Sequence, residues 1–185
     1  MPRSIYVALM LVAGIALVSN WNPSAGDDKE ESWFRTTTVD FGVVVSDIDK
    51  SVAFYQDVLG LKEAFSFSVS GDVARDAGLT AGDSATVHVM TLGDDPTATK
   101  VKLMQIGETT PAKQDLTYIN STLGMSYMTL HVNDVGRVLA NAAEHGVKPI
   151  AKGPADISGG SGNKMVLAIV RDPDGNFVEL VGPLN

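Results

Sequence analysis

Side chains that can move protons or hold charged groups stand alone among apolar residues at three points of the chain. Lys102 and Glu179 each lie between two aliphatic residues, and Asp40 lies between a valine and a phenylalanine. An ammonium group can hold an anion or a carbonyl oxygen, and a carboxylate can act as a general base. Glu179 and Lys102 are therefore the candidate catalytic residues.

The alternation of polar and apolar residues indicates which side chains share a face. Neighbouring residues of a β-strand point to opposite faces of the sheet. Each stretch in which polar and apolar residues alternate therefore predicts a strand with one apolar face and one mixed face. The apolar face is expected to pack against a helix, which leaves the mixed face to line a pocket. The expected pocket-lining residues are Asp40, Val44, His88, Lys102, Tyr127, Thr129, His131 and Glu179.

These strands belong to a folding unit that occurs twice. In the first copy, a strand leads to a helix that Asp47 can cap and Gly60 can end. In the second copy, Asp134 and Gly146 take the same places. About three strands are expected after each helix. Apolar stretches place them near residues 85–92, 101–106, 165–170 and 177–181, with a short helix over 73–77.

Composition limits the classes of protein that need to be considered. With 185 residues, 44% of them hydrophobic, the chain suits one compact domain. Because it has no cysteine, disulfides and thiolate chemistry are excluded. The formal net charge of −8 argues against nucleic acid or an anionic membrane surface as a partner.

The N-terminal region is typical of an exported protein. Arg3 precedes an apolar run over residues 5–18, which has the charge and length of a signal-peptide core but is short for a membrane span. We expect residues 1–26 to be a signal peptide or an N-terminal anchor and residues 27–35 to be an acidic linker. The protein is then periplasmic or extracellular, or it is held at the membrane only by an uncleaved N-terminal segment.

The remaining residues, 36–185, are expected to form one domain. Its first module covers residues 36–107, a connector covers 108–124, and the second module covers 125–183. The sequence leaves open whether the two modules pair within one chain or between the chains of a homodimer.

Two stretches of this domain together resemble the vicinal oxygen chelate superfamily. They are residues 39–61, VDFGVVVSDIDKSVAFYQDVLGL, and residues 172–181, DPDGNFVELV. The superfamily includes glyoxalase I, bleomycin-resistance proteins, fosfomycin-resistance transferases and extradiol dioxygenases, and the resemblance extends over about residues 38–182. It implies an α+β fold of two tandem βαβββ modules that form a curled, incomplete barrel, with helices outside and a ligand on the concave side.

The resemblance also implies where a metal ion would bind. In metal-dependent relatives, His, Gln or Glu ligands come from the first and last strands of each module, at positions that correspond here to Asp40, Lys102, Tyr127 and Glu179. Glu179 matches this pattern and Asp40 is compatible with it. A protonated lysine has no lone pair, and a phenol with a pKa of about 10 is a poor ligand. No cofactor is therefore expected; if a divalent metal ion is present, Glu179 and Asp40 are its candidate ligands.

Three interpretations of these four residues stay open. In the first, they form an ion-pair network where relatives hold an ion. In the second, Lys102 anchors an anionic or carbonyl group, and Asp40 or Glu179 acts as general base. In the third, they form a metal site of unusual composition.

Two functions follow from these interpretations. The first is an exported protein, similar to bleomycin-resistance proteins, that binds a small organic molecule in the cleft between its modules without the usual divalent metal. The alternative is a metal-dependent glyoxalase-type lyase or dioxygenase with an atypical ligand set. The sequence does not decide whether the protein is an enzyme, and it does not identify the ligand.

Overall fold

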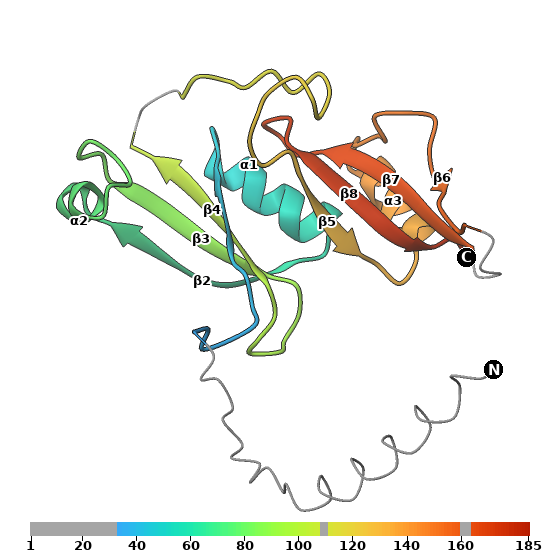
Figure 1. The fold of residues 1–185 in the computed structure, drawn as a ribbon, viewed down its shortest axis with the longest axis horizontal. Helices are drawn as coiled ribbons and strands as arrows, with labels where there is room; N and C mark the ends of the chain where they lie inside the picture. The colour runs from blue at the N-terminus through green and yellow to red at the C-terminus, as the bar shows by residue number, and fades with distance from the viewer. Residues whose placement is uncertain (1–32, 108–110, 160–163) are drawn as a thin grey trace, which may run out of the picture. The chain divides into compact units, whose positions relative to one another are not determined.

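The computed structural model describes residues 33–107, 111–159 and 164–185, of which Thr36–Asn185 belong to one compact unit (Figure 1). The expected signal segment and most of the expected linker lie outside the described residues. Among the described residues, we find no helix that is long and apolar enough to cross a membrane.

The first module contains a four-stranded mixed sheet. The strand order is β1-β4-β3-β2, with β1 parallel to β4 and the other neighbours antiparallel. Its elements are β1 (Phe41–Val44), α1 (Ile48–Ala53), η1 (Phe54–Val58), β2 (Lys62–Val69), α2 (Gly71–Asp76), β3 (Ala85–Thr91) and β4 (Lys100–Ile106).

The second module repeats this topology. Its sheet has the order β5-β8-β7-β6, with β5 parallel to β8. Its elements are β5 (Tyr127–His131), α3 (Val135–Glu144), β6 (Ala155–Asp156), β7 (Met165–Arg171) and β8 (Phe177–Pro183). Two four-stranded mixed sheets with few helices, neither of which closes into a barrel, confirm the expected α+β fold of two tandem modules.

The predicted caps set the ends of the main helices. The Asp47 carboxylate accepts a hydrogen bond from the backbone N–H of Lys50 at 3.1 Å, and Asp134 accepts one from Arg137 at 3.2 Å. Gly60 and Gly146 follow the helices with φ of 76° each, a conformation that glycine adopts without steric cost. The same local signals therefore start and stop both helices.

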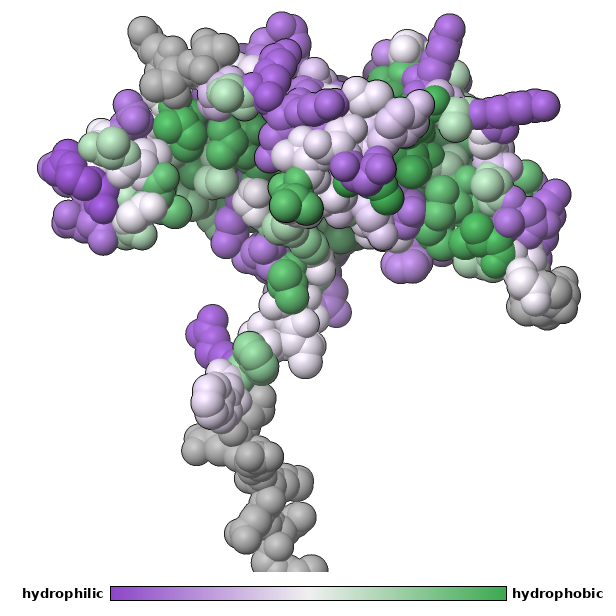
Figure 2. Space-filling view, turned by 45° about the horizontal axis from the view of Figure 1, so that its top comes forward, coloured by the Kyte–Doolittle hydropathy of each residue, from purple (hydrophilic) through white to green (hydrophobic). Residues whose placement is uncertain are grey.

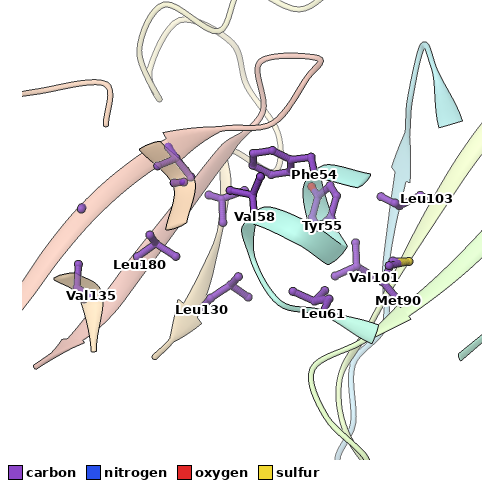
Figure 3. Packing of buried hydrophobic residues seen from close by; sticks show 14 of the residues in the cluster. Phe54, Tyr55, Val58, Leu61, Met90, Val101, Leu103, Leu130, Val135 and Leu180 are labelled. Carbon is purple, nitrogen blue, oxygen red and sulfur yellow. The ribbon is translucent and has the colours of Figure 1, made fainter. Parts of the chain in front are cut away.

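Both helix-covered sheet faces contribute to one hydrophobic core. Figure 3 shows Tyr55 on the side of Leu103 and Val101 of the first sheet, while Val58 lies toward Leu130 of the second sheet. One turn of helix thus presents apolar side chains to both modules.

The other face of the first sheet, which we call the open face, is also apolar. Strand register places Val44 beside Met104 and Phe67 beside Val87 on this face. Ala85, Val87 and Val89 form a second buried cluster there, to which no described helix contributes. Phe65 and Phe67 remain 54% and 43% exposed, with stacked rings whose centroids are 6.0 Å apart.

A buried hydrogen bond joins the two modules. The hydroxyl of Tyr55 in η1 donates to Asp172 Oδ2 at 3.2 Å, and both residues are buried. Asp172 also accepts from the backbone and side-chain N–H groups of Asn176, each at 2.8 Å, and from the backbone of Asp174 at 3.0 Å. Burial raises the pKa of Tyr55, and so does the nearby carboxylate, so the phenol remains a donor.

Replacing Tyr55 with phenylalanine is expected to lower the free energy of unfolding by about 1–3 kcal/mol. The substitution keeps the ring in the core but leaves a buried carboxylate with one donor fewer. Urea unfolding followed by circular dichroism measures the difference. Tyr118→Phe, at an exposed position, is the matched control and should change little. Equal stability of the two variants would contradict a stabilising role for this bond.

Candidate functional site

A cavity of about 660 Å³ lies between the modules. Its walls come from β1 and from the start of β5, which are edge strands of their sheets, and from the turn before β8. The segment 111–116 and the loop that follows α2 complete it. Both copies of the duplicated unit therefore contribute backbone and side chains to one concave site.

The cavity walls are largely apolar, with a few polar groups. Apolar surface comes from Phe41, Val44, Ile106, Met128 and Phe177. Aromatic, aliphatic and thioether side chains of this kind suit a small organic molecule, whose orientation a small number of polar contacts can fix.

Polar groups enter the cavity from both modules. Asp174 Oδ2 accepts a hydrogen bond from the backbone of Ser46 at 3.0 Å, which ties the turn before β8 to the end of β1. Gln114 and the hydroxyl-bearing Tyr127 also line the cavity. Among the described lining residues, Lys113 is the only cation and Asp174 the only carboxylate. The site is thus close to neutral and offers both donors and acceptors.

Two of the eight expected pocket residues, Val44 and Tyr127, line this cavity. Both belong to the strands that flank it, and Tyr127 is about half exposed. The six residues that do not line it are Asp40, His88, Lys102, Thr129, His131 and Glu179.

Asp40 and Lys102 form an ion pair on the first sheet. Lys102 Nζ lies 3.0 Å from Asp40 Oδ2, and the two side chains are 39% and 32% exposed. Lys102 is paired in register with Gly42, so both charged groups project from the open face. The hydrogen bond from Lys102 lowers the pKa of Asp40 below its ordinary value, which keeps the carboxylate ionised.

The polar candidates of the second sheet have other partners. Thr129 Oγ1 donates to Glu179 Oε1 at 2.7 Å, as expected for two residues paired in register on β5 and β8. His131 is exposed at the end of β5. Glu179 is therefore held by a hydroxyl group, and it takes no part in the ion pair of the first sheet.

His88 lies on the helix-covered face of the first sheet. Register places it beside Leu103, one residue out of phase with Lys102. Its Nδ1 is 2.8 Å from Glu63 Oε1. The imidazole therefore belongs to a separate polar contact on the opposite face from Asp40.

The residues that correspond to metal ligands in relatives do not fit a divalent ion. An ammonium group lies within hydrogen-bonding distance of Asp40 and would repel a cation, and Glu179 projects from the other sheet with its own donor. In the part of the chain that the structure describes, no three His, Asp or Glu side chains are grouped so as to hold an ion.

Sequence patterns did not identify several residues that line the cavity. Asp174 and Asn176 belong to the turn before β8, and only the tertiary contact of Asp174 with Ser46 brings this turn to the cavity. Lys113 and Gln114 lie in an irregular segment without periodicity. No local signal could have placed them.

A family model described as the Glyoxalase/Bleomycin resistance protein/Dioxygenase superfamily matches residues 37–180. Among curated proteins, Virulence protein STM3117 of Salmonella typhimurium (strain LT2) is 30% identical over 138 residues, which cover 75% of this chain and 78% of the relative.

Solved structures show the same fold. A glyoxalase family protein from Bacillus cereus has a TM-score of 0.67 at 18% identity, with 84% of this chain and 99% of that chain covered. The trypanothione-dependent glyoxalase I of Leishmania major has a TM-score of 0.55 at 26% identity, with 78% of this chain and 85% of that chain covered.

The stabilising interaction between Asp40 and Lys102 on the first sheet should disappear in acid. Because the folded-state pKa of Asp40 is lowered, its contribution is present above the ordinary value of 3.8 and is lost as the pH falls through the lower folded value. A double-mutant cycle of Asp40→Asn and Lys102→Met, measured by urea unfolding, is expected to give less than about 1 kcal/mol at neutral pH, since the pair is partly exposed. Coupling that persists near pH 2 would mean that the charges are not its source.

Proposed function

This chain belongs to the glyoxalase/bleomycin resistance protein/dioxygenase superfamily, and we propose that it binds a small organic molecule in the cavity between its two modules without a divalent metal ion. The observation that carries the proposal is the cavity itself. Its volume of about 660 Å³ suits a compact organic molecule, and both modules build its walls.

The lining favours a ligand with an apolar body and a hydrogen-bonding end. Phe41, Val44 and Met128 offer apolar contact along the strands, whereas Tyr127 and Gln114 offer a hydroxyl group and an amide. Burying the apolar body supplies affinity, and the polar groups select its orientation. A highly charged ligand would find only one cation, Lys113, among the described lining residues.

The metal-free part of the proposal is supported by Lys102. Its ammonium group lies 3.0 Å from the Asp40 carboxylate, at a position where metal-dependent relatives carry a ligand, and a positive charge there would repel a cation. Export is supported by the sequence alone, through the apolar run over residues 5–18 that follows Arg3.

The alternative function is a metal-dependent lyase or dioxygenase. The observation in its favour is the 26% identity to the Leishmania major glyoxalase I. Glu179 and Lys102 would then be the candidate catalytic residues, and Glu179 and Asp40 would be the candidate ligands of the ion.

We also propose that a second copy of the chain covers the open face of the first sheet. A sheet with apolar residues on both faces requires cover on both. On the open face the stacked rings of Phe65 and Phe67 stay 54% and 43% exposed, which leaves apolar surface for a second copy to bury. Figure 2 shows hydrophobic surface toward both ends of the domain, with hydrophilic and neutral residues between.

A thermal-shift screen of small organic metabolites tests the binding function. A compound at about 100 times its Kd adds about 2.7 kcal/mol, which raises Tm by roughly 5–10 °C for a domain of this size. Val44→Trp places a bulky indole ring in the cavity and is expected to reduce the shift. Val39→Trp, at an exposed position outside the lining, is the matched control and should keep the shift.

Metal analysis of the purified protein separates the two functions. In the thermal-shift screen, equal Tm shifts in native protein and in Val44→Trp would contradict binding in the cavity. One equivalent of zinc, nickel, manganese or iron that is lost in Glu179→Leu would favour the alternative enzyme.

Substituting the exposed phenylalanines is expected to dissociate the dimer. Phe65→Ser with Phe67→Ser removes the stacked rings from the open face, so the mass from light scattering should fall from two chains to one at micromolar concentration. Leu123→Ser changes a side chain that is 98% exposed in the connector and should leave the mass unchanged. A native chain that is already monomeric would refute this part of the proposal.

A further inference from the structure

One wall of the cavity is made by a segment that lies outside both four-stranded sheets. Residues 111–126, which we call the connector wall, contain no helix or strand. Several of them, including Gln114, Leu116 and Met125, line the cavity. The shape of the site therefore depends on what fixes an irregular segment in place.

The connector wall is folded mainly on itself. Asp115 accepts a hydrogen bond from the backbone of Thr117 at 2.9 Å, and the hydroxyl of Thr122 donates to the carbonyl of Asp115 at 2.9 Å. The hydroxyl of Ser126 donates to the carbonyl of Ile119 at 3.3 Å. These bonds preserve the local shape of the segment but do not attach it to either sheet.

Arg171, at the end of β7, supplies that attachment. Its Nη2 donates to the carbonyls of Leu116 at 2.6 Å and Thr117 at 3.4 Å, while Nη1 donates to the carbonyl of Gly175 at 2.7 Å. The guanidinium carbon lies 4.2 Å from the centre of the Phe177 ring. Among the hydrogen bonds shown by the described residues, those that link the connector wall to a sheet all start from Arg171.

Apolar packing adds little to this attachment. Leu123 is 98% exposed and Tyr118 is 70% exposed, so these large side chains of the connector wall bury little surface. A segment with few buried apolar contacts opens at a low free-energy cost. The planar fork of Arg171 is then the main restraint, because it bonds to two segments at once.

We infer that Arg171 is the positioning residue of the cavity and that the connector wall opens as a lid when its bonds to Leu116 and Thr117 break. The inference rests on the proposed binding function and deepens it, because it assigns control of ligand entry to one side chain. Leu116 and Phe177, which both contact the arginine or its acceptors, also line the cavity, so displacement of the guanidinium changes the site directly.

Limited trypsin proteolysis tests the inference without a ligand. Lys113 provides a cleavage site within the connector wall, and Lys102 within β4 provides an internal reference for global unfolding. Arg171→Met is expected to accelerate cleavage after Lys113 about tenfold, because proteolysis follows the population of the open form. Cleavage after Lys102 should keep its native rate.

Two further variants separate positioning from general destabilisation. Arg171→Lys keeps the charge but cannot bond to Leu116 and Gly175 in the same way, so an intermediate rate is expected. Arg137→Met changes an exposed arginine of α3 and should behave like native protein. Equal acceleration at both lysines, or native rates in Arg171→Met, would overturn the inference. A failed ligand screen would not alter these outcomes, so the two proposals fail separately.

Discussion

The hydrogen bond between Tyr55 and Asp172 is the contact on which the arrangement of the site depends. It buries a phenol and a carboxylate at the junction of the two modules, where an unpaired polar group would be costly. The same carboxylate organises the turn that follows β7, and Asp174 of that turn reaches the backbone of Ser46. The position of the cavity wall therefore follows from a bond within the core.

This bond also lies within the part of the chain that carries the family resemblance. The two stretches that carry the resemblance contain its two partners, Tyr55 in the helical turn and Asp172 in the final turn. They maintain the junction between the modules.

Local patterns predicted most of the fold and little of the site. Helix caps and the alternation of polar and apolar residues depend on neighbours in sequence. Both helices and the strands near 85–92 and 165–170 were therefore confirmed, with their ends moved by one or two residues. Strand β2 was not located, because its exposed phenylalanines share the strand with charged residues. Alternation identified which face Lys102 occupies, but the cavity lies between the edges of β1 and β5. Only tertiary packing determines where two edges meet.

The connector wall has one further consequence, which concerns symmetry. Two copies of one folding unit, with matching strand orders, each contribute their first strand to the cavity. Residues 111–126 have no counterpart in the repeat, and several of them line the cavity. The cavity is therefore lined asymmetrically although its scaffold is duplicated, and under the proposed binding function this asymmetry would distinguish the two ends of a ligand.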